Sequence, residues 1–246
     1  MFIATIVVGK QLSSGKMPPI RKLPAIDALE EAVGRASEMD RPIHATTGYG
    51  RGTITDAEYG SQHVAGMAVI AHLAKLSARK DAKLIVTLCP PEAIPVVDSS
   101  MRDAYVAEGK EDAYSPDMIR HYGTLQWGYT LGVLGLLAQE KPASNVMVGG
   151  WLAENLVIAE SGCFLGALQI GGTMELDATP FFIATCNHVL IGQEIFAVSA
   201  YLSQDPKLVA NVRVSDLSSI AISLMLIAAV LFATVRSDWL VNLLKL

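Results

Sequence analysis

Short apolar runs that end at glycine alternate with helical runs along most of the chain, and this alternation constrains the fold. The pattern is densest between Asn145 and Tyr201, where VMVGG precedes WLAENLVIAE, ALQIGG precedes PFFIATC, and HVLIG precedes QEIFAVSAYL. Short apolar strands that alternate with helices are typical of a mainly parallel sheet with helices on both faces. The sequence therefore predicts an α/β, Rossmann-like domain.

Five segments read as strands of this sheet, near residues 43–47, 83–88, 145–149, 167–171 and 188–191. The segment KLIVTL at 83–88 is apolar throughout, as expected of a strand that is covered on both faces. Upstream of it, Thr55 and Glu58 form a capping-box pattern that predicts the start of a long helix. Further on, Ser115 precedes proline and predicts an N-cap.

Residues 124–139 are strongly apolar but contain three glycines, Gly128, Gly132 and Gly135. Because the glycines interrupt the apolar run, we predict a buried helix packed closely on the sheet rather than a membrane span. Small residues let helices approach closely, so these glycines also predict a surface for self-association.

Residues 217–235, LSSIAISLMLIAAVLFATV, contain no charge and predict one C-terminal transmembrane helix. At a rise of 1.5 Å per residue, this helix is roughly 28 Å long, close to the hydrocarbon thickness of a bilayer. The predicted organisation is then an apolar and basic segment over 1–22, an α/β domain over 23–212, the span, and an interfacial tail over 236–246.

The apolar run from Phe2 to Val8 is too short to cross a bilayer as a helix. Three interpretations stay open: an edge strand, a segment that dips into the membrane surface, or the end of a longer anchor. Basic residues follow it at Lys10, Lys16, Arg21 and Lys22. If the run touches the membrane, the positive-inside rule places the α/β domain on the cytoplasmic side.

The charge and the cysteines exclude several classes of function. The net charge is −5, so the chain lacks the basic surface of a nucleic-acid-binding protein. Cys89, Cys163 and Cys186 lie far apart without CxxC spacing, which predicts buried, reduced thiols rather than a disulfide framework. No metal site is predicted, because Cys186 and His188 lack a second ligand pair at recognisable spacing.

Several runs resemble a prokaryotic family of membrane-anchored proteins catalogued as a domain of unknown function. They are RKLPAIDALEEAVGRASEMDRP, NVMVGGWLAENLVIAESG, LQIGGT, PFFIATCNHVLIGQEIFAVSAYLS and the hydrophobic C-terminal helix, and they cover roughly Arg21 to Val235. The resemblance implies an anchored α/β domain and no established activity. Members often begin with a complete membrane helix, so the short FIATIVV departs from the family pattern.

Four of the five predicted strands run directly into glycine. Ligands of open parallel sheets bind outside the carboxyl ends of the strands, where helix N-termini offer unpaired N–H groups. Arg51 is suited to pair with an anionic group, and Glu154 and Glu194 follow glycine turns. The candidate ligand-binding residues are Gly48, Gly50, Arg51, Gly149, Gly150, Glu154, Gly171, Gly172, Thr173, Gly192 and Glu194.

Each of these residues also has a structural explanation. Tight turns need glycine whether or not a ligand binds, and carboxylates stabilise helix N-termini. The loop from Gly48 to Gly52 reads GxGxG rather than the GxGxxG of dinucleotide-binding proteins, and no GxxxxGK[ST] is present. The sequence therefore assigns no catalytic residue and no cofactor.

The sequence favours a single-pass membrane protein whose α/β domain is a binding or scaffold component of a homo-oligomeric membrane assembly, without evident catalytic activity. Its partners would be the lipid bilayer and further copies of itself. One alternative is a nucleotide- or small-ligand-binding enzyme or sensor that uses the glycine-rich strand ends. A further alternative is an accessory subunit of a heteromeric complex with other membrane proteins.

Overall fold

The computed structural model describes residues 24–203 and 206–234. The chain divides into two units, an α/β unit over Arg21–Leu202 and a second unit that comprises Met1–Ile20 and Ser203–Leu246. The predicted apolar and basic segment over 1–22 and the interfacial tail over 236–246 lie outside the described residues.

Six parallel strands form one sheet in the order β3-β2-β1-β4-β5-β6. They are β1 (Ile43–Thr46), β2 (Leu84–Leu88), β3 (Ile119–His121), β4 (Ser144–Val148), β5 (Leu168–Thr173) and β6 (His188–Ile191). This order is typical of Rossmann folds, in which the chain changes direction across the sheet between the first and fourth strands. The topological switch point therefore lies between β1 and β4.

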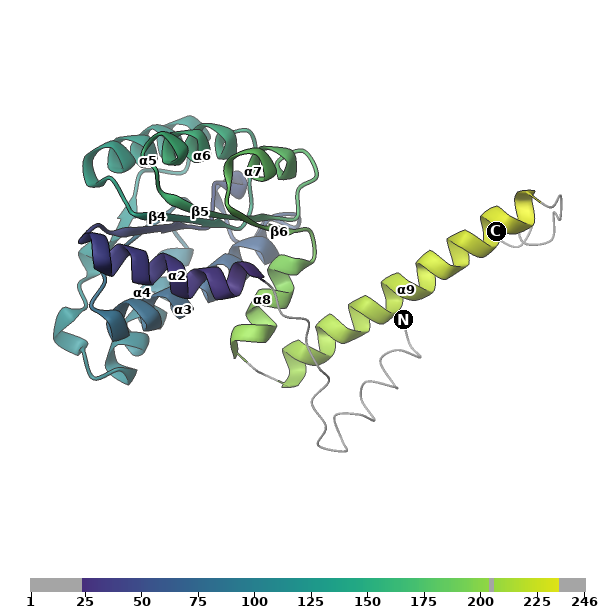
Figure 1. The fold of residues 1–246 in the computed structure, drawn as a ribbon, viewed down its shortest axis with the longest axis horizontal. Helices are drawn as coiled ribbons and strands as arrows, with labels where there is room; N and C mark the ends of the chain where they lie inside the picture. The colour runs from purple at the N-terminus through teal and green to yellow at the C-terminus, as the bar shows by residue number, and fades with distance from the viewer. Residues whose placement is uncertain (1–23, 204–205, 235–246) are drawn as a thin grey trace. The chain divides into compact units, whose positions relative to one another are not determined.

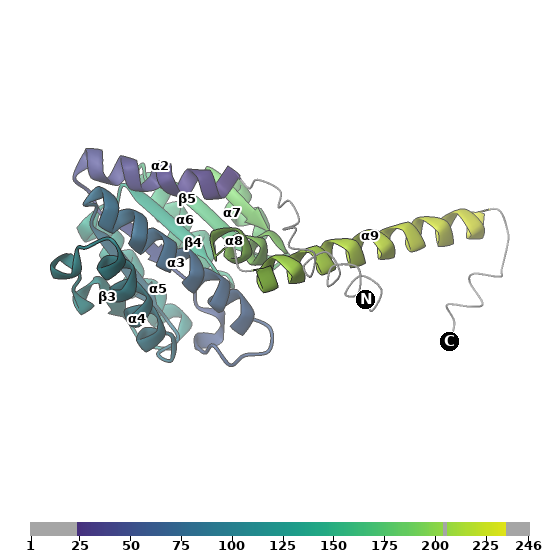
Figure 2. The ribbon, with the colours of Figure 1, turned by 90° about the horizontal axis from the view of Figure 1, so that it is seen from below.

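Helices cover both faces of the sheet (Figures 1 and 2). One face carries α2 (Pro24–Met39), α3 (Gly60–Lys80), α4 (Ala93–Ala107) and α8 (Glu194–Ser203), and the other carries α5 (Gln126–Glu140), α6 (Glu154–Phe164) and α7 (Thr179–Thr185). The short helices η1 (Gly50–Gly52), η2 (Glu111–Ala113) and η3 (Pro116–Met118) lie in connections. Covering both faces buries every residue of β1, β2, β4 and β5.

The α/β fold and the five predicted strands are confirmed, and the structure adds β3, which the sequence did not indicate. This strand has three residues at the edge of the sheet, and Arg120 and His121 are exposed. A strand so short and so exposed has no apolar periodicity to detect. The predicted N-cap beside it is confirmed, since the Ser115 side chain accepts a hydrogen bond from the backbone N–H of Asp117.

The capping box predicted at Thr55 and Glu58 is wrong. The long helix α3 begins at Gly60 instead. In the turn before it, the Asp56 carboxylate accepts hydrogen bonds from the backbone N–H groups of Glu58 and Tyr59, at 2.9 and 3.1 Å. These two donors stabilise the charged carboxylate and lower its pKa.

The apolar segment 124–139 forms α5, and the prediction that this helix is buried is correct for one side only. Tyr129, Val133 and Leu137 are fully buried against the sheet. On the opposite side, Trp127 is 56% exposed and Leu131 is 68% exposed. Apolar periodicity identifies a helix, but here the apolar residues continue around its solvent side.

The three cysteines are free thiols, as predicted, but only Cys89 is buried. Burial raises the pKa of the Cys89 thiol to about 12 and makes it unreactive. Cys186 is partly buried and Cys163 is exposed, so the prediction of three buried thiols is wrong for Cys163. Its thiol donates to the Thr185 carbonyl at 3.1 Å and accepts from the Gln169 amide at 3.2 Å.

The second unit contains α9 (Pro206–Thr234), a helix of 29 residues. Its segment Val212–Leu231 is long and apolar enough to cross a membrane, with a mean hydropathy of 2.1 and no buried residue. The length and composition thus support the predicted C-terminal span, which begins within this helix rather than at its first residue.

A row of buried polar side chains crosses four strands of the sheet. His44 on β1 contacts Thr87 on β2 through Nε2 at 2.9 Å and Asn145 on β4 through Nδ1 at 2.7 Å. The Asn145 amide then donates to Gln169 on β5 at 3.1 Å. Because Asn145 presents its carbonyl oxygen to His44, Nδ1 carries the proton and Nε2 accepts from the Thr87 hydroxyl.

The row predicts acid sensitivity. Burial lowers the pKa of His44 from 6.5 to about 4, although the bond to Asn145 opposes this shift. A lowered pKa means that the folded chain gains stability above pH 6.5 and loses it as the pH falls toward 4. Between about pH 7.5 and pH 5, we expect this residue alone to reduce the free energy of unfolding by about 2 kcal/mol.

Urea unfolding of the detergent-solubilised chain at the two pH values would measure this loss. Burial also lowers the pKa values of His63 and His72, so their contributions have the same sign. Comparison with His44→Gln therefore isolates the contribution of His44. Between pH 7.5 and pH 5, the free energy of unfolding of this variant should fall less than that of the unaltered chain. An equal drop in both would contradict the assignment to His44.

Candidate functional site

The loops that follow β1 and β4 meet at the switch point, and they contain the candidate residues Gly48, Gly149 and Gly150. The Gly150 N–H donates to the Thr47 carbonyl at 3.1 Å. A Cβ atom on Gly48 would lie 2.2 Å from the Gly150 carbonyl oxygen, and one on Gly149 would lie 2.1 Å from the Thr47 carbonyl oxygen. These glycines therefore allow two backbones of the protein itself to touch.

Aromatic side chains fill the space over the same strand ends. Trp151 is fully buried and packs edge-on against Phe182, with ring centroids 5.6 Å apart. Tyr59 is 4% exposed, and its side chain lies 3.0 Å from the position that a Cβ atom on Gly150 would take. In dinucleotide-binding folds this crevice receives the cofactor, whereas here the protein's own rings occupy it.

Arg51 lies in η1 beside Gly50, in the loop after β1. Its guanidinium forms ion pairs with Asp56 at 3.6 Å and Glu58 at 3.2 Å, and it lies over the Tyr59 ring at 5.3 Å from the centroid. The Arg51 side chain is 56% exposed, so each ion pair contributes little stability. An anionic ligand would nevertheless compete with two carboxylates for this charge.

Glu154 is fully buried at the start of α6. One carboxylate oxygen accepts from the Leu152 N–H at 3.1 Å, and the other accepts from the Gln126 amide at 2.7 Å. Glu194, at the start of α8, accepts from the Ile191 N–H at 3.1 Å. Since α6 and α8 cover opposite faces of the sheet (Figure 1), the structure does not bring the two carboxylates into one pocket.

Gly171 and Gly172 lie inside β5 rather than in the turn after it, so the predicted end of this strand at residue 171 is wrong. A Cβ atom on Gly171 would approach Phe182 to 2.7 Å, and one on Gly172 would approach Leu190 to 3.1 Å. Both glycines thus make room for neighbouring side chains. Beyond β6, Gly192 has a φ of 59° and donates its N–H to the Thr173 carbonyl.

Gln62 on α3 holds the end of β5, and sequence reasoning missed it. Its carbonyl oxygen accepts from the Met174 N–H at 2.9 Å and from the Thr173 hydroxyl at 3.3 Å, and its amide donates to Glu175 at 2.5 Å. The residue is 1% exposed. A single polar residue in an apolar helix face is the only signal that could have indicated this role.

Within the described ranges 24–203 and 206–234, the buried polar atoms without a hydrogen-bond partner include Thr47 Oγ1, His63 Nδ1 and Trp151 Nε1, which lie in or beside the loops after β1 and β4. Among the residues of these ranges, no group of three His, Cys, Asp or Glu side chains could hold a metal ion. Ligand binding at the strand ends stays a prediction.

Comparison with protein families finds one match over nearly the whole chain. The model described as Domain of unknown function (DUF6754) covers residues 1–244. The chain belongs to the DUF6754 family. No curated protein and no solved structure matches it. The match confirms the resemblance to an uncharacterised family, and it assigns no activity to the DUF6754 residues described above.

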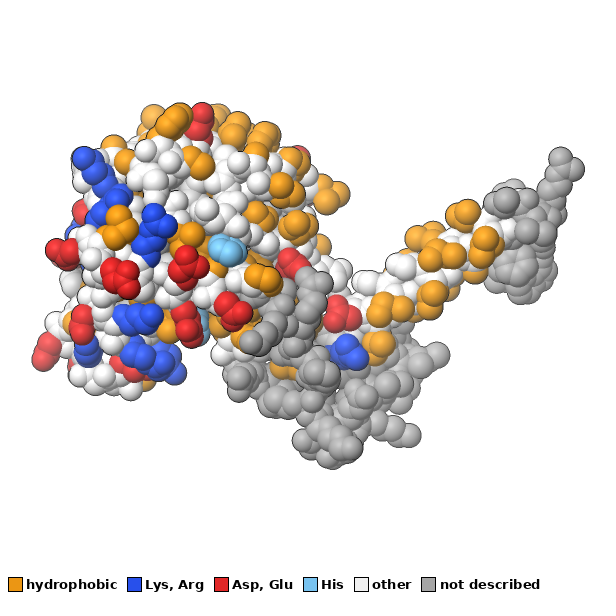
Figure 3. Space-filling model, in the orientation of Figure 1, with side chains coloured by type: hydrophobic (Ala, Val, Ile, Leu, Met, Phe, Trp, Pro, Cys, Tyr) orange, Lys and Arg blue, Asp and Glu red, His pale blue; other side chains and the backbone are white. Residues whose placement is uncertain are grey.

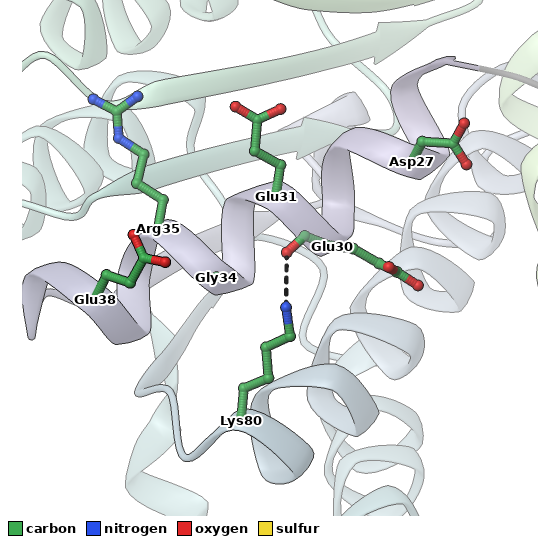
Figure 4. A pocket seen from close by; sticks show the side chains of 7 residues that line it. All are labelled: Asp27, Glu30, Glu31, Gly34, Arg35, Glu38 and Lys80. Atoms are coloured by element: carbon green, nitrogen blue, oxygen red, sulfur yellow. Dashed lines mark hydrogen bonds between the residues drawn. The ribbon is translucent and has the colours of Figure 1, made fainter.

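A pocket of about 600 Å³ lies between α2 and the C-terminal end of α3 in this DUF6754 chain (Figure 4). Exposed charged side chains surround it, and Lys80 donates to the Glu30 backbone carbonyl at 3.4 Å. Its lining residues are Asp27, Glu30, Glu31, Gly34, Arg35, Glu38 and Lys80. The C-terminal end of α3 leads into β2, so the pocket lies away from the carboxyl ends of the strands and contains no predicted site residue.

The contacts at the switch point predict an unequal cost for two glycine substitutions. Gly48 and Gly192 both have positive φ, at 80° and 59°, but only Gly48 has neighbours within 4 Å of a Cβ atom. We expect Gly192→Ala to cost about 1–2 kcal/mol of stability from backbone strain alone. Gly48→Ala should cost about 2–5 kcal/mol, because overpacking adds to the same strain.

Thermal or urea unfolding of the two variants would measure this difference, with Gly192→Ala as the matched control. Equal destabilisation would mean that the loops after β1 and β4 are free to separate. That result would favour an open crevice and the ligand-binding alternative.

Proposed function

We propose that this chain is a membrane-anchored scaffold, whose α/β unit binds other copies of itself in a homo-oligomeric membrane assembly. Three features support the proposal. The crevice that would hold a ligand is filled by Trp151 and Tyr59, α9 contains a segment suited to cross a membrane, and the α5–α7 layer has an apolar outer surface. The proposal depends most on the apolar outer surface of the α5–α7 layer.

The apolar face is the outer surface of α5, α6, α7 and the segments beside them. Its large exposed side chains are Leu125 (77%), Trp127 (56%), Leu131 (68%), Phe164 (83%), Leu176 (85%), Phe181 (36%) and Ile183 (58%). Figure 3 shows hydrophobic side chains gathered along this layer, whereas most visible charged side chains lie over the α2–α4 side.

The size of the apolar face fits a protein interface. At roughly 150–250 Å² for an aromatic side chain, the exposed fractions of Trp127, Phe164 and Phe181 amount to about 260–440 Å². The four exposed leucine and isoleucine side chains add to this area, and a stable interface buries about 800 Å² on each partner. Monomeric soluble proteins rarely leave more than a few hundred Å² of contiguous apolar surface exposed. An interaction surface is therefore a better explanation of the face than chance.

The face also lacks the charge that would suit other partners. Between residues 122 and 193 the chain has one basic residue, Lys141, and five acidic residues. Anionic lipid headgroups and nucleic acids are attracted by clustered basic residues. An apolar protein surface is the partner that this composition favours.

The mass of the solubilised chain tests the proposal. We expect the protein in mild detergent at micromolar concentration to form an assembly whose mass is a multiple of 26.3 kDa. Leu131→Glu should dissociate it, because the substitution buries a charge in the contact. Val106→Glu is the matched control, since Val106 is 49% exposed on α4, away from the apolar face.

Light scattering coupled to size-exclusion chromatography would measure the masses after subtraction of bound detergent. A strict monomer at micromolar concentration would contradict the scaffold function. An assembly that dissociates equally with Val106→Glu would contradict the role of the apolar face.

We further propose that the α/β unit lies on the cytoplasmic side, as the basic residues near the N-terminus suggest. Cys163 offers a direct test, because it is the exposed cysteine among the three. A membrane-impermeant maleimide should label Cys163 only after the cells are opened, and Cys163→Ser should abolish this signal. Labelling of intact cells would place the unit outside.

A further inference from the structure

The exposed side of α5 combines two large side chains with two glycines. Trp127 and Leu131 are more than half exposed, and Gly128 and Gly135 are exposed as well. A Cβ atom on Gly135 would meet nothing within 4 Å, and one on Gly128 would meet nothing closer than 3.9 Å. Exposed glycine destabilises a helix relative to alanine, and no described neighbour requires either glycine here.

Trp127 and Gly135 lie at equal distances from Leu131 along α5. Trp127 precedes it by four positions and Gly135 follows it by four, so the three residues form one i, i+4 row on the helix surface. A two-fold axis beside Leu131 would run this row antiparallel to the same row of a second copy. Trp127 of each copy would then lie beside Gly135 of the other.

We propose that two copies of the chain associate through an antiparallel α5–α5 contact centred on Leu131, in which Trp127 of one copy occupies the hollow over Gly135 of the other. Rows of this i, i+4 type pack together in the commonest class of helix–helix contact. The inference rests on the scaffold function proposed above and specifies its contact.

The composition of the row favours a second copy over other occupants. The exposed residues of α5 are Trp127, Gly128, Leu131, Gly135, Ala138 and Gln139, and none of these described residues carries a charge. A contact of the row with its own copy therefore buries no charge. A lipid surface is disfavoured, because the neighbouring surface carries the exposed acidic residues Glu160 and Asp177.

Position-specific cross-linking tests the geometry. In a Cys163→Ser background, Leu131→Cys should form a disulfide-linked dimer under mild oxidation, because the two-fold axis brings both copies of residue 131 together. Ala138→Cys is the matched control on the same exposed side. It lies about 10 Å along the helix from Leu131, so its two copies would be about 20 Å apart and should not cross-link.

A second variant distinguishes a specific contact in the hollow over Gly135 from non-specific hydrophobic association. Gly135→Leu adds apolar surface, so a non-specific contact would become tighter. In the proposed contact the leucine fills the space that Trp127 needs, and the dissociation constant should rise by about tenfold or more. The Tm of the dissociated chain should not fall, because leucine is a better helix former than glycine.

Analytical ultracentrifugation of the full chain in detergent would measure the dissociation constants, with Ala138→Leu as a control that adds a leucine on the exposed side of α5 outside the i, i+4 row. Unchanged or tighter association of Gly135→Leu, or cross-linking at Ala138 but not at Leu131, would overturn the α5 contact. If the unaltered chain still forms an assembly in that case, the scaffold function stands with a different interface. A monomeric unaltered chain would overturn both.

Discussion

The hydrogen-bonded row from Thr87 through His44 and Asn145 to Gln169 is the constraint on which the arrangement of the sheet depends. Buried polar groups are costly unless each finds a partner, and the partners here lie on four different strands. A shift of any strand by one residue would turn its polar side chain to the opposite face. The row therefore specifies both which central strands are neighbours and their register. A purely apolar core would favour burial of these strands without specifying their order.

The sequence predicted the elements better than their contacts. Short apolar runs were enough to locate β2 and β4, and glycines marked the ends of β1 and β4, but the sequence did not indicate that the loops after these two strands meet. What fills that point was not predictable, because Trp151 is buried against residues such as Phe182 that are distant in sequence. The same holds for His44, whose partners lie 43 and 101 residues away. Local patterns report burial and periodicity, and they carry little information about which side chains meet.

The closed switch point changes the interpretation of a familiar topology. In this strand order, a glycine-rich first loop ordinarily lets a pyrophosphate approach the backbone. Here the glycines after β1 and β4 let one loop approach the other, and Glu154 links α5 to α6 through Gln126 instead of facing a substrate. Fold alone does not determine function. The proposed role in assembly follows from the outer surface of the α5–α7 layer rather than from the strand ends.

The pairing of β1 with β4 has a consequence for synthesis on the ribosome. Ile43 pairs with Leu84 and with Ser144, so one side of β1 can pair early and the other must wait for about a hundred more residues. At roughly 5–20 residues per second, this wait lasts about 5–20 s. During that time a growing chain has an unpaired strand edge and a half-partnered His44. The central strand pair that defines the finished sheet is thus the pair whose formation leaves the nascent chain exposed for longest.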